Sequence, residues 1–183
     1  MQINSIAEVI KFYNENRKRR FVFVGKGGSG KDYARKLMES LGYKYQISFT
    51  TRPPRSTEVH GKDYFFTYNE KFKDLINLGF FYEHVEFNGW LYGTSKYQMD
   101  TLDSLFIMTP KGLEHMIDED RASSLVVYFD IDEDTRRQRI SLRSDADTVE
   151  RRLKADDRDF YRFQNYDLVI TNPEFSLSYD VEL

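Results

Sequence analysis

A glycine-rich segment that ends in lysine carries the clearest chemistry in the sequence. Gly25-Lys26-Gly27-Gly28-Ser29-Gly30-Lys31 matches the pattern G-x-x-x-x-G-K, in which backbone N–H groups curl around phosphate oxygens. A helix that begins where such a loop ends adds a favourable dipole, and Lys31 is placed to neutralise charge on β- and γ-phosphates. The alternative, an ordinary glycine-rich turn, is disfavoured because an apolar run precedes the segment and a helical pattern follows it.

The residue after this loop departs from the pattern. Asp32 stands where serine or threonine is expected. An aspartate beside bound phosphates repels them unless a cation lies between, and Mg²⁺ takes oxygen ligands. We therefore expect Asp32 to be a magnesium ligand, directly or through water. The alternative is an acid in the first helical turn that complements the helix dipole.

A second cationic feature follows in a polar loop over residues 50–63. Its start, Thr50-Thr51-Arg52-Pro53-Pro54-Arg55, places two guanidinium groups close together on a proline-stiffened chain. Guanidinium forks suit phosphate oxygens, so the loop is a candidate second phosphate site. Alternatively, the two arginines are simply solvated.

One carboxylate falls on an apolar strand face. In the predicted strand 80–87, alternation places Glu83 on the same face as Phe81 and Val85, whereas His84 and Glu86 face solvent. A buried carboxylate needs a partner. That partner is either a ligand with two adjacent N–H donors or a nearby arginine or lysine.

Short apolar runs alternate with helical stretches along the chain, which indicates an α/β fold with a parallel sheet. Asn88-Gly89 predicts a type I′ hairpin turn, and Gly42 closes the helix that begins at the phosphate loop. The predicted strands are 21–24, 45–48, 80–87, 90–92, 105–108, 125–129 and 168–170.

An amphipathic helix is predicted over residues 3–16, before the first of these strands. We expect it to pack on the core rather than to bind a partner. Its apolar positions are Ile3, Ile6, Val9, Ile10 and Tyr13.

Length and composition limit the class of protein. The chain has 183 residues, which suits one domain, and its net charge of −3 (27 Lys+Arg, 30 Asp+Glu) argues against bulk binding to nucleic acid or membrane. It contains no cysteine, no apolar run of about 18 residues and no basic-then-apolar N-terminus. We therefore expect a cytoplasmic protein that binds neither nucleic acid nor membrane.

Taken together, these segments resemble the guanylate kinase family over roughly residues 20–172. The phosphate loop is shared with many nucleotide-binding families. The stretch from Ser48 to Thr94 is more diagnostic, because its motifs follow the family's order and spacing. These motifs are Ser48-Phe49-Thr50-Thr51-Arg52-Pro53-Pro54-Arg55, Glu58, Gly61-Lys62-Asp63-Tyr64, Glu83 and Tyr92-Gly93-Thr94.

The resemblance implies a role for each matching residue. In the acceptor site, Arg52, Arg55, Tyr64 and Tyr92 would hold the phosphate of the nucleotide, Glu83 would accept hydrogen bonds from guanine N1 and N2, and Ser48 and Thr94 would lie near O6. On the donor side, ATP would meet Gly25, Gly27, Gly28, Ser29, Gly30, Lys31, Asp32, Arg139 and Asn172. The lid arginines would be Arg139, Arg143 and Arg152, and the catalytic cations Lys31, Arg52, Arg55, Arg143 and Arg152.

The sequence departs from the family where an Asp-x-Asp is expected after the acceptor-binding segment. Ile107 and Thr109 occupy the two acidic positions. The first loss removes a carboxylate that helps to position magnesium, for which Asp32 could compensate. The second leaves Thr109 as a weaker contact to the base, so base specificity could be relaxed.

The resemblance implies an α/β P-loop kinase with a central parallel sheet flanked by helices, plus an acceptor-binding region and a lid. The single domain 1–183 would divide into a core (1–46, 97–134 and 156–183), an acceptor region (47–96) and a lid (135–155). The implied reaction is γ-phosphoryl transfer from ATP to GMP or dGMP with Mg²⁺, by a monomer or homodimer. The alternatives are a nucleoside monophosphate kinase of altered base specificity and a non-catalytic binding module on the same scaffold.

Overall fold

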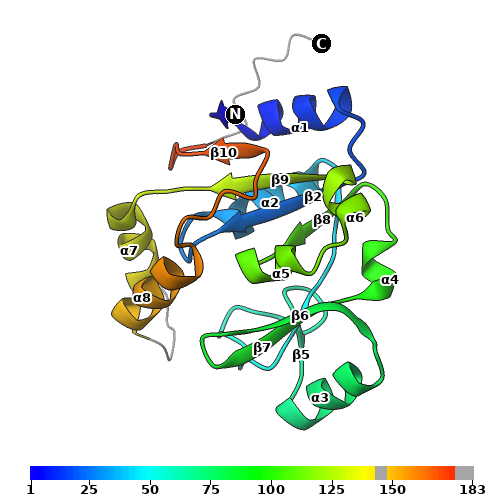
Figure 1. Ribbon diagram of the computed structural model, residues 1–183. Helices are drawn as coiled ribbons and strands as arrows, with labels where there is room; N and C mark the ends of the chain where they lie inside the picture. The colour runs from blue at the N-terminus through cyan, green and yellow to red at the C-terminus, as the bar shows by residue number, and fades with distance from the viewer. Residues whose placement is uncertain (143–147, 176–183) are drawn as a thin grey trace.

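A sheet of six parallel strands forms the centre of the protein (Figure 1). The structure is a computed structural model that describes residues 1–142 and 148–175. In order across the sheet, the strands are β1 (Gln2–Ile3), β10 (Leu168–Ile170), β9 (Ser124–Phe129), β2 (Arg20–Gly25), β8 (Ser104–Ile107) and β3 (Lys44–Tyr45). The predicted parallel α/β sheet is confirmed.

Both faces of this sheet are covered, which explains why its strands read as unbroken apolar runs. Every residue of β2 is buried. Phe21 and Phe23 join the core on one face, and Val22 and Val24 join the core on the other. The first face is covered by α1 (Ile6–Glu15) and α2 (Lys31–Ser40), and the second by α4 (Lys96–Met99) and α5 (Pro110–Glu114).

The N-terminal helix packs on the core, as expected. Ser5 caps it by accepting a hydrogen bond from the backbone N–H of Glu8 at 3.3 Å. Its buried face includes Tyr13, whose ring stacks on Phe21 with centroids 3.8 Å apart.

A second, smaller sheet carries the hairpin. Its strand order is β5 (Phe65–Phe66), β4 (Phe49–Thr50), β7 (Trp90–Ser95) and β6 (Phe81–Phe87), and α3 (Asn69–Asn77) packs beside it. Asn88 and Gly89 adopt φ values of 56° and 82°, so the predicted hairpin turn is confirmed. All four strands fall within residues 47–96, and the function of this region as an acceptor site stays a prediction.

The helices α7 (Glu133–Ser141) and α8 (Val149–Asp159) lie beside the carboxyl ends of strands β2 and β9 (Figure 1). They span most of the segment predicted as a lid, and that assignment also stays a prediction. The remaining helix is α6 (Asp118–Ser123). Within the described ranges, no helix is long and apolar enough to cross a membrane.

Three details differ from the sequence prediction. Ile3 belongs to β1, not to the N-terminal helix, because Ser5 caps that helix, which begins only at Ile6. Of the strand predicted at 45–48, only Tyr45 lies in a strand, β3, and the next strand, β4 (Phe49–Thr50), belongs to the other sheet. The elements α3, α4 and β5 were not predicted.

Candidate functional site

A cavity of about 660 Å³ opens where the carboxyl ends of β2 and β8 meet the second sheet and the helices α7 and α8. Of the predicted site residues, Thr94 and Asn172 do not line it, and Arg143 lies outside the described residues. The cavity brings together the others: Gly25, Gly27, Gly28, Ser29, Gly30, Lys31, Asp32, Ser48, Arg52, Arg55, Tyr64, Glu83, Tyr92, Thr109, Arg139 and Arg152.

The phosphate loop runs from the end of β2 to the start of α2. Gly30 is the N-cap of α2 with φ 94°, a conformation that a side chain would strain. The Lys31 ammonium donates to the carbonyl oxygens of Gly25 and Lys26 and, at 3.3 Å, to Ser29 Oγ. The ammonium therefore rests on the oxygens of its own loop, beside the N–H groups that would receive phosphate.

Close packing explains the glycine at position 28. Its φ is 78°, and a Cβ there would lie 2.8 Å from the backbone oxygen of Arg136 in α7. We expect Gly28→Ala to lower the free energy of unfolding by about 3 kcal/mol, from the strained φ and the overpacking together.

A matched control for that prediction is Gly42→Ala. Gly42 has φ 93°, but a Cβ there would meet nothing within 4 Å. This variant should lose only about 1 kcal/mol, the conformational part. Denaturant unfolding measures both, and equal losses would contradict the close contact between the phosphate loop and α7.

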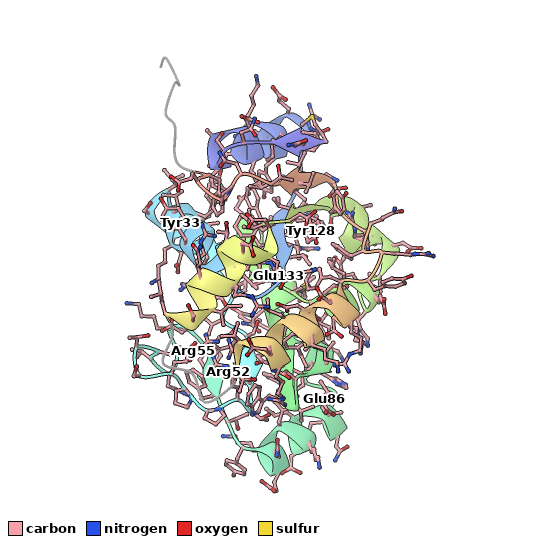
Figure 2. The ribbon with its side chains drawn as sticks, turned by 90° about the vertical axis from the view of Figure 1, so that its left-hand side faces the viewer. Tyr33, Arg52, Arg55, Glu86, Tyr128 and Glu133 are labelled. Atoms are coloured by element: carbon pink, nitrogen blue, oxygen red, sulfur yellow. The ribbon has the colours of Figure 1, made fainter. Side chains whose placement is uncertain are left out.

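Glu58 joins the two arginines of the proline-stiffened loop. Arg52 Nη2 lies 2.7 and 2.8 Å from the two Glu58 oxygens, and Arg55 Nη1 lies 2.9 Å from Oε1. The guanidinium of Arg52 also lies over the Tyr64 ring, 5.4 Å from its centroid. Figure 2 shows Arg52 and Arg55 next to each other below α7 and α8. Arg52 is buried rather than solvated, so the loop holds its cations in fixed positions.

Glu83 is buried on the apolar face of β6, as the strand alternation predicted, whereas His84 and Glu86 are exposed. It forms no ion pair with any residue that the structure describes, so neither arginine nor lysine is its partner there. Burial raises the pKa of Glu83 to about 7, and Thr94 and the charge of His115 lower that pKa in part.

Thr94 is almost fully buried beside the Glu83 carboxylate. Its hydroxyl is close enough to act on that carboxylate, yet it forms no hydrogen bond of ordinary geometry. Gly112 of α5 lies on the other side, where a Cβ would be 3.2 Å from Glu83 Oε2. The carboxylate is therefore held in a narrow slot that faces the cavity.

At the end of β8, the two positions that depart from the family both line the cavity. Ile107 offers no ligand atom. The Thr109 hydroxyl accepts a hydrogen bond from the Gly112 N–H at 3.1 Å and so caps α5. Asp32, at the start of α2, is 64% exposed, and its contact with Arg35 Nε is long, at 4.0 Å.

Arg139 connects α7 to two other segments that line the cavity. Its guanidinium donates to the Gly28 carbonyl oxygen at 3.2 Å and to the Pro173 carbonyl oxygen at 2.7 Å. Asn172 Oδ1 accepts from the N–H of Glu174 at 2.9 Å, so the side chain shapes a turn. Its role as a nucleotide contact stays a prediction.

Sequence reasoning assigned no role to three residues of this site. Glu58 was quoted as part of a motif, but its contacts with two arginines depend on how the loop folds. Phe175 packs over the phosphate loop, where a Cβ on Gly30 would lie 2.9 Å from its ring. Asp156 of α8 accepts a hydrogen bond from the Gly27 N–H at 2.8 Å. It could have been found, because Leu153 and Phe160 place it on the apolar face of the helix.

The parallel sheet, the glycine loop between β2 and α2 and the cationic cavity at the strand ends define a P-loop protein of the α/β class. The family model "Guanylate kinase" matches residues 17–181. The chain therefore belongs to the guanylate kinase family, and the resemblance and fold class predicted from the sequence are confirmed.

Individual relatives agree with the family match. A guanylate kinase of Legionella pneumophila (strain Paris) is 32% identical over 173 residues, 88% of this chain and 82% of the relative. One of Koribacter versatilis is 28% identical over 171 residues, 85% and 72%. The crystal structure of guanylate kinase from Anaplasma phagocytophilum superposes with a TM-score of 0.65 at 26% identity, covering 85% of this chain and 77% of that chain.

Proposed function

We propose that this protein is an enzyme that transfers the γ-phosphoryl group of ATP to GMP or dGMP. The observation that carries the proposal is Glu83, a buried carboxylate with no ion pair to a described residue, which faces the same cavity as the phosphate loop. Guanine presents two adjacent N–H donors on one edge, and these donors would supply the hydrogen-bond partners that a buried carboxylate requires.

The cations of the cavity divide between the two nucleotides. Lys31 and the loop N–H groups would bind the donor phosphates, and Arg139 and Arg152 line the cavity on the lid side. Arg52 and Arg55, fixed by Glu58, would hold the acceptor phosphate together with Tyr64 and Tyr92. No covalent intermediate is required, because phosphoryl transfer depends on positioning and on charge stabilisation.

A divalent cation fits the donor side of this site. The described residues contain no group of three or more metal-ligating side chains, but Mg²⁺ is commonly held by one or two carboxylates together with substrate phosphates. Asp32 supplies one carboxylate to the cavity, which the residues Ser29 and Thr109 also line. When bound, the ion would neutralise phosphate charge.

We expect Asp32→Ser to raise the magnesium concentration needed for half-maximal rate by about tenfold, because a carboxylate is lost beside the cation. The measurement is the initial rate as a function of MgCl₂ at fixed ATP and GMP. Glu39→Gln is the control, since Glu39 is exposed on the same helix, forms an ion pair with Arg35 and lies outside the cavity. An unchanged magnesium dependence in Asp32→Ser would rule out the metal role of Asp32.

The test of the function is turnover of a panel of ribo- and deoxynucleoside monophosphates with ATP and MgCl₂, followed by identification of the products. Turnover of GMP or dGMP is the expected result. Turnover of a non-guanine acceptor alone would contradict guanine specificity and would identify a nucleoside monophosphate kinase of altered base specificity. No turnover of any acceptor would favour a binding module. A cytoplasmic location and the oligomeric state remain predictions.

A further inference from the structure

A buried carboxylate lies directly on the phosphate loop. Asp156 Oδ2 accepts a hydrogen bond from the Gly27 N–H at 2.8 Å, and the Asp156 side chain is only 4% exposed. Its contact with Arg136 Nη1 is longer, at 3.4 Å. The shorter and better-formed contact of Asp156 is therefore with the loop, not with its cationic neighbour.

The position of this carboxylate matters because it takes a place suited to a phosphate oxygen. Backbone N–H groups of such a loop bind anionic oxygens, and here the anionic oxygen belongs to the Asp156 side chain of the protein itself. Lys26 and Lys31 act on the same carboxylate through their charges. The surroundings of Asp156 are thus those of a bound phosphate.

The next residue adds a second contact between the same two segments. Asp157 forms an ion pair with Lys26 at 2.8 Å, so two consecutive acids of α8 attach the helix to the phosphate loop. The Lys26–Asp157 pair is largely exposed on the acid's side and contributes little. Asp156 is therefore the main electrostatic attachment of α8 to the loop.

We propose that Asp156 is a positioning residue that sets the affinity for the donor: its carboxylate holds the Gly27 N–H and α8 in place until donor phosphates displace it. The inference rests on the proposed function only in naming ATP as the donor. Displacement removes one charge-assisted hydrogen bond and leaves a negative carboxylate near negative phosphates. Donor affinity is consequently weaker than the loop alone would provide, and binding loosens α8 from the loop.

The test is calorimetric binding of ATP with MgCl₂, and separately of inorganic tripolyphosphate, without any acceptor. Asp156→Asn keeps an oxygen that can accept from the Gly27 N–H but removes the charge. It should bind both probes about five- to tenfold more tightly than the wild-type protein, while the affinity for GMP stays within about twofold. A residue that only stabilised the fold would give the opposite sign, because a loosened lid weakens binding.

Asp159→Asn is the matched control. It makes the same change of charge on the same helix, but Asp159 does not line the main cavity, so both affinities should remain near the wild-type values. Tripolyphosphate binding that is equal or weaker in Asp156→Asn than in wild type overturns the inference, as does no binding to either protein. If Asp156→Asn binds tripolyphosphate more tightly than wild type but neither protein binds ATP, the role of Asp156 is supported and ATP is not the donor.

A measurement on the wild-type protein is independent of whether the variant folds. The NMR signal of the Asp156 carboxyl carbon should shift when tripolyphosphate is added, since the carboxylate leaves the Gly27 N–H. An Asp156 signal that stays in place while the Lys31 signals shift would overturn the proposal.

Discussion

Replacing Lys31 with methionine should lower kcat by about a thousandfold, and the KM for GMP should change little. Methionine keeps much of the length of lysine but has no charge and no donor. Fixed cationic groups at a transferring phosphoryl group contribute on the order of 10² to 10⁵ in rate. The KM for GMP should stay close to the wild-type value because Arg52 and Arg55, which Glu58 holds in place, lie on a different loop from Lys31.

The control for this variant is Lys36→Met on the same helix. Lys36 is exposed and lies outside the cavity, so its loss should leave kcat and both KM values unchanged. Steady-state kinetics with ATP and GMP varied in turn measures the two effects separately. If Lys31→Met retained more than about a tenth of the wild-type kcat, the transition-state role of Lys31 would be wrong.

The central sheet could be predicted because buried parallel strands are apolar along their whole length. The runs at 21–24 and 125–129 contain no alternation that might suggest a solvated face, and both lie inside the sheet. The two-residue strands could not be found in this way. β1 and β3 lie at opposite edges of the sheet, where pairing with β10 and β8 defines them, and two residues carry no pattern.

The candidate site was predictable where one residue type in one local pattern decides the chemistry. The glycines and Lys31 form such a pattern, and so does Glu83 on an apolar strand face. Glu58 was different, because its contacts depend on the path of the loop over residues 50–63. Asp156 had a signal equivalent to that of Glu83, an acid on an apolar helix face, but its partner is a backbone N–H that the sequence cannot indicate.

The distribution of acids around the cavity also differs from what the family resemblance implies. Ile107 and Thr109 leave the end of β8 without a carboxylate, whereas Asp32 and Asp156 bring two acids to the cavity from α2 and α8. These two acids have different environments, because Asp32 is mostly exposed and Asp156 is buried on the loop. One is therefore suited to a hydrated cation, and the other to a contact within the protein.

Glu83→Gln should raise the KM for GMP by about a hundredfold at pH 8, and wild-type affinity should itself depend on pH. A glutamine offers guanine one acceptor oxygen and an NH₂ group that meets another donor, so a charge-assisted pair of hydrogen bonds is lost. The control is Glu86→Gln, on the opposite, exposed face of the same strand; Figure 2 shows Glu86 away from Arg52 and Arg55. That variant should leave the KM unchanged.

The pH dependence follows from the raised pKa of Glu83, about 7 in the absence of nucleotide. Guanine donors favour the charged carboxylate, so GMP must displace a proton below pH 7. The KM for GMP should therefore rise about tenfold between pH 8 and pH 6, in which range the ionised fraction falls by the same factor. The phosphate of GMP titrates in the same pH range. The Glu83→Gln variant retains only the pH dependence of that phosphate, so the difference between wild type and variant measures the contribution of Glu83.

Stability should respond with the opposite sign. A carboxyl group whose pKa is raised from 4.5 to about 7 binds its proton more tightly in the folded state, so the fold loses stability as pH rises through this interval. Above pH 7 the charged, buried Glu83 destabilises the nucleotide-free fold, and Glu83→Gln should be more stable than wild type by about 3 kcal/mol at pH 8 and not at pH 4. If Glu83→Gln has a higher free energy of unfolding at pH 8 than wild type and yet binds GMP more weakly, Glu83 serves ligand binding at a cost in stability. Equal KM values for wild type and Glu83→Gln across this pH range would remove guanine recognition from Glu83.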